Sequence, residues 1–226
     1  MGTVSRFYAV FTGDLIRSSA LTKKQLDAVR RDFLTAAGAI NQAGWADGKL
    51  LRGQPEFFRG DAWQMLLTDP RWALRVAIYL RAVMLGQGLA DTRIAIGIGA
   101  VDSVSRTRVS LSRGEAFTRS GRALDSMSPR FRMAIAVPDE SRAMGDWLST
   151  VVALCDCIIG RWQTRQAQVA GLMSLRKSAS HADIARLTKP RRISQQAVSK
   201  ALGAAGWPGL ELAMERFESI SWQQPF

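Results

Sequence analysis

The chain has 226 residues, enough for one large domain or two modest ones. Its 47% hydrophobic content is that of a globular protein and excludes a chain that is disordered throughout. Lysine and arginine outnumber aspartate and glutamate by 31 to 19, which gives a net charge of +12 and a sequence pI near 10.9. This excess favours a polyanion or an anionic membrane surface as partner, and the alternative is a basic surface without a specific partner.

Soft metal ligands are scarce in this sequence. The two cysteines, Cys155 and Cys157, are two residues apart, so on a helix they point to different faces and do not form a zinc pair. The one histidine, His181, is remote in sequence from the acidic residues considered below. Zinc hydrolases and Ser-His or Cys-His nucleophile systems are therefore poor candidates.

The N-terminal segment shows no charged stretch followed by an apolar one, as a secretory signal would. The apolar run at residues 151–159 is too short to span a bilayer and contains Asp156. We expect a cytoplasmic protein without a membrane partner.

Hydrophobic periodicity predicts alternating strands and helices up to residue 137. The elements expected are a strand at 7–12 ending at Gly13-Asp14, a helix at 22–43, a hairpin with Gly60-Asp61 at its tip and a second strand reaching 65–67, a helix from Asp69-Pro70 to Gly86, a strand at 92–101, a helix at 114–127 and a strand at 132–137. This order predicts an α/β fold with helices against a mixed sheet. On the helix that begins at Asp69-Pro70, the stripe pattern places Arg71, Arg75 and Arg81 largely to the side of the core.

The strand at 92–101 has two different faces. Isoleucines fill one face and small residues the other, at Ile94, Ile96 and Ile98 and at Ala95, Gly97 and Gly99. Glycines weaken a strand, so the bare face is expected to admit a close neighbour: a packed helix, a partner subunit or a ligand.

After Asp139 the sequence becomes almost entirely helical. A long helix is expected at about 141–172, broken near Gly160, as a connector and dimerisation element. We place the domain boundary near 140 to 150, with an α/β domain at 1–140 and a helical domain at 141–226.

The helical part contains a predicted helix-turn-helix at 181–187 and 193–202. Ser194 caps the second helix, whose first turns project polar side chains that can contact bases or phosphates. The predicted DNA-binding residues are Lys189, Arg191, Arg192, Ser194, Gln195, Gln196, Ser199 and Lys200. The turn between the helices is longer than usual and basic, and residues 174–202 hold seven Lys or Arg against one acid. The alternative is a structural helical bundle with a solvated basic face. In either case the last helix is expected to run through Phe217.

Residues 6–137 resemble the class III nucleotidyl cyclase homology domain, which has a ferredoxin-like mixed sheet. The segments that carry the resemblance are YAVFTGDLIRSS (8–19), RGDAWQ (59–64), RIAIGIG (93–99), GEAF (114–117) and RAL (122–124). The whole chain is similar to the SatD-like group of bacterial proteins, in which such a domain precedes a helix-turn-helix.

The resemblance implies roles for particular residues. Asp14 and Asp61 fall on the metal-binding aspartates of cyclases, which would hold Mg²⁺ or Mn²⁺ with a nucleotide. Arg122 falls on the transition-state arginine. Three further nucleotide-binding positions depart from the family pattern: Thr118 replaces an asparagine, and Phe57 and Leu111 replace the purine-selecting lysine and acid. Phe57 and Leu111 cannot hydrogen-bond a base edge, so the usual purine selectivity is lost.

These residues also have purely structural interpretations. Asp61 suits a hairpin turn without a metal, and Asp14, Ser18 or Ser19 could cap the following helix. Arg122 could pair with Asp125 or Glu115 on its own helix.

The sequence therefore predicts a DNA-binding transcription regulator that acts on double-stranded DNA as a homodimer. Its cyclase-like domain would be a non-catalytic sensor or dimerisation scaffold with a possible nucleotide ligand. The alternative is a metal-dependent nucleotidyl cyclase with a DNA-binding appendage. A third possibility is a structural dimer without a small-molecule ligand.

Overall fold

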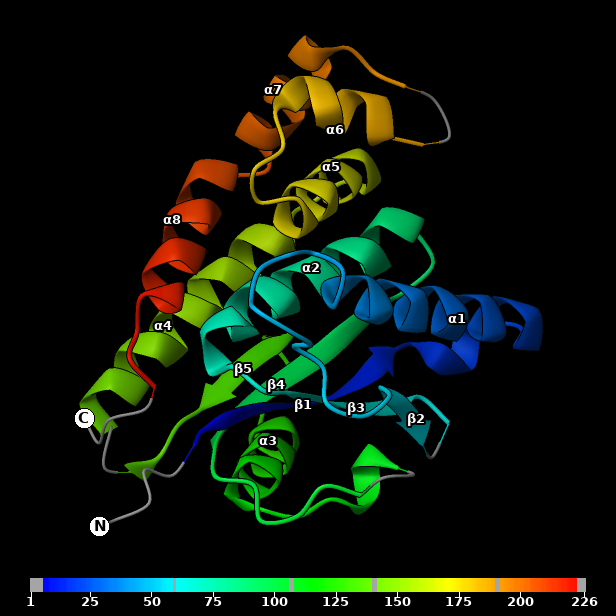
Figure 1. Ribbon diagram of the computed structural model, residues 1–226. Coiled ribbons are helices and arrows are strands. Elements are labelled where there is room, and N and C mark those ends of the chain that lie inside the picture. Colours follow the sequence, from blue (N-terminus) through cyan, green and yellow to red (C-terminus); the bar gives the residue numbers. More distant parts are fainter. Residues whose placement is uncertain (1–5, 59, 106–107, 140–141, 190–191, 223–226) are drawn as a thin grey trace.

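The computed structural model describes residues 6–58, 60–105, 108–139, 142–189 and 192–222. One five-stranded sheet with the order β2-β3-β1-β4-β5 forms its centre (Figure 1). Its strands are β1 (Tyr8–Ile16), β2 (Glu56–Phe58), β3 (Ala62–Leu67), β4 (Asp91–Gly99) and β5 (Met133–Ala136). Neighbouring strands are antiparallel except β4 and β5, which are parallel, so the predicted mixed α/β sheet is confirmed.

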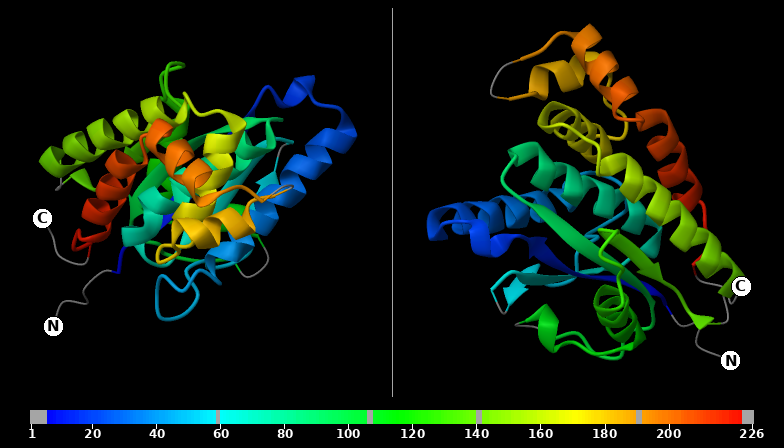
Figure 2. Two further views of the ribbon diagram at one scale, coloured as in Figure 1. Left: turned by 90° about the horizontal axis from the view of Figure 1, so that it is seen from above. Right: turned by 180° about the vertical axis from the view of Figure 1, so that it is seen from behind.

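Helices cover both faces of the sheet (Figures 1 and 2). One face carries α3 (Glu115–Asp125), and the other carries α1 (Lys23–Ile40) and α2 (Ala73–Gln87). The later helices are α4 (Arg142–Ile159), α5 (Thr164–Leu175), α6 (His181–Leu187), α7 (Gln195–Ala204) and α8 (Trp207–Glu218), and the short 3₁₀ turns are η1 (Ser18–Ala20), η2 (Pro70–Trp72) and η3 (Val109–Leu111). Among these, α5 packs on α2, and α6 and α7 lie beyond α5, away from the sheet.

β1 is longer than the sequence pattern predicts, because it continues through Gly13 and Asp14 to Ile16. A Cβ at Gly13 would lie 2.4 Å from the Trp63 ring, so the glycine lets that buried indole cross β1. The capping role considered for Asp14, Ser18 or Ser19 is wrong: Thr22 caps α1, in a capping box with Gln25.

The two predicted faces of β4 are confirmed. Its isoleucines lie in the main core, and α3 packs against the face that carries the small residues. A Cβ at Gly97 would lie 2.2 Å from the carbonyl oxygen of Ala116 and 2.4 Å from the amide nitrogen of Ser120. The neighbour that the bare face admits is therefore a packed helix, whose backbone almost touches the strand.

Gly97→Ala is expected to destabilise the fold by several kcal/mol, roughly 2 to 4, because α3 must move away from the sheet to make room for the methyl group. The matched control is Gly121→Ala within α3, where an added Cβ meets open space. There the change should be neutral or stabilising by up to about 1 kcal/mol, since alanine is the better helix former. Urea unfolding of both variants measures the difference, and equal effects would contradict it.

α2 is buried on nearly all sides, between the sheet and α5. The expectation that Arg75 and Arg81 lie to the side of the core is therefore wrong, since they are only 2% and 0% exposed. Each has an acidic partner from a distant part of the chain. Arg75 pairs with Glu218 of α8, and Arg81 pairs with Asp91 and with Asp156 of α4. The partners compensate the cost of burying the two guanidinium groups.

The C-terminal helices share one continuous hydrophobic core with the sheet and α2. The long helix predicted at about 141–172 is two helices, α4 and α5, and the break at Gly160 is confirmed. The division into domains at 1–140 and 141–226 stays a prediction.

The apolar run in α4 is amphipathic, with its two cysteines on different faces as predicted: Cys155 is buried and Cys157 exposed. Burial raises the pKa of the Cys155 thiol to about 12, so this thiol stays protonated at neutral pH. No helix in the described part of the chain is both long enough and apolar enough to cross a bilayer.

Arg81→Met is expected to cost about 3 to 5 kcal/mol of unfolding free energy, because it leaves the buried carboxylate of Asp156 without its guanidinium partner. Arg71→Met is the control: Arg71 pairs with Asp69 at the surface, where its side chain is 53% exposed, and should lose no more than about 1 kcal/mol. Chemical denaturation of both variants tests this. Similar losses of unfolding free energy for the two variants would show that the buried ion pair stabilises the fold no more than the exposed one does.

Candidate functional site

Asp14 and Asp61 lie next to each other at one end of the sheet. Asp14 is opposite Ala62 in the pairing of β1 with β3, and the amide of Leu15 donates to the carbonyl oxygen of Asp61 at 3.2 Å. Arg30 of α1 donates to the carbonyl oxygen of Gly60 and so holds the hairpin tip against the helix. The fold thus places the two predicted metal ligands side by side.

The carboxylates themselves already have protein partners. Arg93 lies opposite Asp14 on β4 and binds both of its oxygens, with Nε 2.9 Å from Oδ1 and Nη2 on Oδ2. The hydroxyl of Ser18 donates to Oδ2 of Asp61 at 2.5 Å. The hydrogen bond from Arg93 to Asp14 raises the pKa of Arg93, and the charges of Asp125 and Asp61 raise it further. Arg93 thus pairs directly with Asp14, and two further carboxylates favour its charged form.

This arrangement does not fit a divalent cation as it stands. Arg93 occupies the oxygens of Asp14 that a metal would need, and a guanidinium and a metal ion cannot share them. Among the described residues, no group of three or more His, Cys, Asp or Glu side chains is placed to hold a metal ion. A metal at Asp14 and Asp61 therefore stays a prediction, with the added condition that Arg93 must first release Asp14.

Sequence reasoning gave Arg93 no role, although a signal for it was present. In an antiparallel pair, a residue near the end of one strand faces a residue near the start of the next. The expected strands that end at Asp14 and begin near Arg93 could have been paired in that way.

The four predicted nucleotide-binding residues lie in two places. Phe57 is half-buried on β2, with its ring 5.3 Å from that of Phe33. Leu111 is exposed on η3, which contacts β2. Thr118 and Arg122 lie one turn apart on the exposed side of α3. Phe57 and Leu111 therefore lie beside the hairpin. Thr118 and Arg122 lie on α3, which packs against one face of the sheet.

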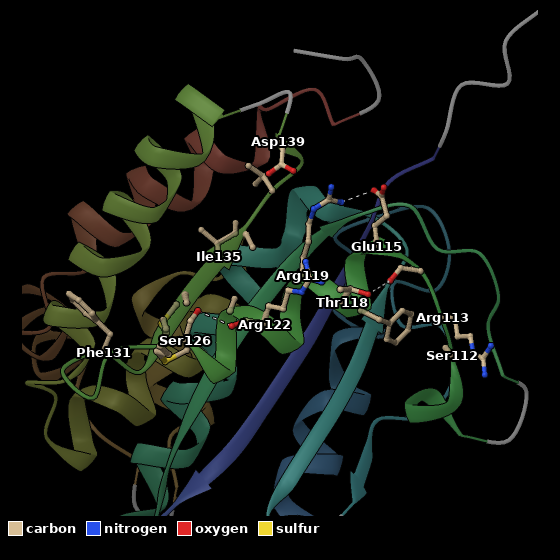
Figure 3. A pocket seen from close by; sticks show the side chains of 18 of the residues that line it. Ser112, Arg113, Glu115, Thr118, Arg119, Arg122, Ser126, Phe131, Ile135 and Asp139 are labelled. Atoms are coloured by element: carbon tan, nitrogen blue, oxygen red, sulfur yellow. Dashed lines mark hydrogen bonds and ion pairs between the residues drawn. The ribbon is translucent and has the colours of Figure 1, made fainter.

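The largest pocket among those described is an open groove between α3 and β5, of about 1070 Å³ (Figure 3). Three arginines, Arg113, Arg119 and Arg122, line it, and Arg119 pairs with Glu115 at 2.7 Å. Among the described residues Arg122 has no ion pair, so the pairing considered for it with Asp125 or Glu115 is not found. Thr118 and Arg122 share this groove. Three acids, Asp102, Glu115 and Asp139, also line it, so the lining is balanced in charge. The groups that could bind an anion such as a phosphate are Arg113 and Arg122, which have no ion pair within the described chain.

The predicted DNA-binding residues lie on and before α7. Ser194 caps α7 by accepting a hydrogen bond from the amide of Ala197 at 3.1 Å. The exposed side chains in this region are those of Lys189, Arg192, Ser194, Gln195, Gln196, Ser199 and Lys200. Arg191 lies outside the described residues. α6 and α7 pack on each other and α7 packs on α5, so the polar side chains project from a three-helix unit.

Comparison with known proteins finds solved structures of nucleotidyl cyclases. A bacterial light-regulated adenylyl cyclase matches at 17% identity and a TM-score of 0.40, over 57% of this chain and 42% of its own. The guanylyl cyclase Cya2 matches at 19% identity and a TM-score of 0.40, over 60% of this chain and 77% of its own. The chain thus spans less than half the length of the first. No protein-family model and no curated protein matches it.

Replacing Arg93 by glutamine is expected to tighten Mn²⁺ binding about 10- to 100-fold, because it removes a bidentate charged competitor worth roughly 1.5 to 3 kcal/mol. Isothermal titration with MnCl₂ compares the variant with the wild type. The double variant Arg93→Gln, Asp61→Asn is the control and should lose the gain. If Arg93→Gln binds Mn²⁺ no better than the wild type, the two carboxylates are not a latent metal site.

Proposed function

We propose that this protein binds double-stranded DNA through α6 and α7 and regulates transcription, with the sheet and its helices as scaffold. The observation that supports this is the division of α7 into two faces. Val198 and Leu202 are buried, while Gln195, Gln196 and Lys200 are exposed. A glutamine at the start of an exposed helix can bond adenine bidentately in the major groove.

The charges around α7 favour the same partner. Within the described residues Lys189, Arg192 and Lys200 form no ion pairs, so their charges are free to contact phosphates. Two other cations nearby are compensated by the protein itself: Lys177 pairs with Glu218, and Arg186 with Asp183. Apart from Arg176 at the end of α5, the cations without an ion pair in the described part of residues 174–202 therefore lie on α7 and on the segment before it, where a DNA backbone would run beside the proposed recognition helix.

The segment between α6 and α7, residues 188–194, is here called the connector. It is long, but it is anchored at its start. Thr188 is buried, and its hydroxyl donates to the carbonyl oxygen of Ile184 at 2.8 Å. The amide of Ile193 donates to the carbonyl oxygen of Ala185 at 3.4 Å, which ties the other end of the connector to α6. A helix pair held in this way can present α7 without a short turn.

The role proposed for the sheet half is that of a dimeric sensor or scaffold. Phe57 packs against α1 and Leu111 offers no hydrogen bond, so neither can select a base. A phosphate-bearing ligand could still be held by Arg113 and Arg122 beside α3, neither of which has an ion pair within the described chain. Such a ligand would act as a signal, and we expect the protein to bind it without converting it to a product.

The second candidate is a metal-dependent nucleotidyl cyclase, favoured by the proximity of Asp14 to Asp61 and by the exposed Arg122. Incubation with each nucleoside triphosphate and Mg²⁺ or Mn²⁺ distinguishes the two candidates. Release of pyrophosphate that Asp61→Asn abolishes would establish the enzyme, and its absence would leave the scaffold.

Lys200→Ala and Arg192→Ala are each expected to weaken DNA binding several-fold and to reduce the slope of log K against log salt by about 1, because each removes one phosphate contact. Lys24→Ala on α1, an exposed lysine far from α7 in the sequence, is the matched control and should change neither quantity. Fluorescence anisotropy with duplex DNA from the region upstream of the protein's own gene, measured at several salt concentrations, provides both values. Absence of wild-type binding at low salt would refute the proposal.

A further inference from the structure

α2, α5 and the start of the connector together line a pocket of about 360 Å³, which we call the α2–α5 pocket. α2 contributes Val83 and Gly86 to it, and α5 contributes Gly171 and Leu172. The two helices pack closely, since a Cβ at Gly171 would lie 3.3 Å from the Cβ of Ala82. Because α6 lies beyond α5 (Figure 1), the pocket is at the place where the scaffold meets the proposed DNA-binding helices.

The lining of the α2–α5 pocket is mostly apolar. Apart from glycines, alanines and aliphatic side chains, it consists of Tyr79, Gln87, Gln168, Thr188 and Lys189. The side chains of Gln87, Gln168 and Thr188 each donate a hydrogen bond to another part of the protein. An apolar pocket with a small number of polar groups is the usual form of a small-molecule site. Tyr79 and Lys189 are the polar groups that remain for a ligand.

Tyr79 is buried without a hydrogen-bond partner. It is only 5% exposed, yet its hydroxyl forms no hydrogen bond within the described part of the chain. A buried tyrosine hydroxyl usually has a partner. Burial raises the pKa of Tyr79 to about 12, although the charge of Arg176 acts in the opposite direction, so the phenol stays protonated at neutral pH. The hydroxyl can therefore donate to an acceptor oxygen inside the pocket.

Lys189 adds a positive charge to the same lining. Its side chain is exposed and forms no ion pair within the described residues, and none of the described residues that line the pocket is an aspartate or glutamate. One donor hydroxyl and one ammonium group can together satisfy the two oxygens of a carboxylate. A phosphate group carries more charge and three strong acceptor oxygens, which this apolar lining could not satisfy. The lining therefore favours an apolar molecule with a carboxylate.

We propose that the α2–α5 pocket binds a small apolar carboxylate, which Tyr79 and Lys189 hold by its oxygens. Its apolar part lies between α2 and α5 and covers Leu187, which ends α6 and is 43% exposed. A ligand paired with Lys189 withdraws that lysine from DNA phosphates, and this regulatory step rests on the proposed DNA binding. The ligand and DNA therefore each weaken the binding of the other by the same factor.

Sodium octanoate is the probe, and 1-octanol is its control, because it has the same chain length without the charge. Isothermal titration with the full chain should give a dissociation constant below about 1 mM for octanoate and at least 10-fold weaker binding of octanol. Octanol that binds as tightly as octanoate would overturn the carboxylate as the recognised group.

Two variants test the groups that hold the carboxylate. Tyr79→Phe should weaken octanoate binding at least about 10-fold, because it removes a hydrogen bond to a charged group. Lys189→Ala should weaken it about 3-fold, since an exposed ion pair contributes less. Tyr8→Phe on β1 is the matched control and should bind octanoate like the wild type. The Tyr79 hydroxyl has no partner to lose within the described chain, so the melting temperature of Tyr79→Phe should stay within about 2 °C of the wild type. Unchanged octanoate affinity in Tyr79→Phe would contradict its role.

Nuclear magnetic resonance locates the bound probe, because the chain has only two tyrosines, Tyr8 and Tyr79. In protein labelled with ¹³C in its tyrosine rings, octanoate should shift the signal of Tyr79, assigned by its loss in Tyr79→Phe, and leave that of Tyr8 in place. Octanoate that does not bind, or that binds without shifting the Tyr79 signal, would overturn the proposal whether or not the protein binds DNA.

Fluorescence anisotropy with duplex DNA tests the regulatory step separately. Saturating octanoate should weaken DNA binding several-fold, about as much as Lys189→Ala does, and should have no further effect on that variant. Sodium acetate at equal concentration is the salt control and should leave DNA binding unchanged. DNA affinity that octanoate does not alter would overturn the opposition between ligand and DNA. A wild type that binds octanoate at Tyr79 but binds no DNA would refute the proposed function and support the ligand site.

Discussion

The buried guanidinium of Arg81 joins the parts of this molecule that are most distant in sequence. It binds Asp91 at the start of β4 and Asp156 in α4, and the other oxygen of Asp156 accepts hydrogen bonds from the amides of Arg132 and Met133 at the start of β5. One cation thus fixes α2, two strands and α4 relative to one another. Because α4 is fixed in this way, its inner face, with Leu148, Val152 and Ile159, must fill the core. Because α5 packs on α2, the same contacts also set where α6 and α7 are displayed.

The sequence predicts the elements whose signal is local. Alternation along β4 was enough to assign its two faces, and Gly160 was enough to break the long helix. The pattern failed where a partner is remote. Arg75 and Arg81 look like surface residues because their charge is visible in the sequence. The acid that neutralises Arg75 lies 143 residues away, and one of the two acids that neutralise Arg81 lies 75 residues away. Arg93 was missed for a related reason: its role follows from strand register, which only the assembled sheet defines.

The same sheet explains how the two aspartates can lie side by side. Two carboxylates at adjacent positions repel each other, and a fold that brings them together needs a positive charge nearby. Arg93 supplies it from the neighbouring strand, and Ser18 satisfies an oxygen of Asp61. The contacts that these carboxylates make with Arg93 and Ser18 therefore contribute to the stability of the sheet. A site organised in this way can serve as scaffold, and a cation or nucleotide would have to compete with Arg93 before it could act as a signal.

The distribution of charge separates the cations of the scaffold from those of the proposed DNA-binding surface. Residues 174–202 carry a net charge of +6, while α8 carries three glutamates against one arginine. Glu218 of α8 pairs with both Arg75 and Lys177, so one acid holds two cations of the scaffold in place. Within the described residues Lys189, Arg192 and Lys200 have no such acid. Their charges are therefore not needed to hold the helices together, and a polyanion is the kind of partner that would neutralise them.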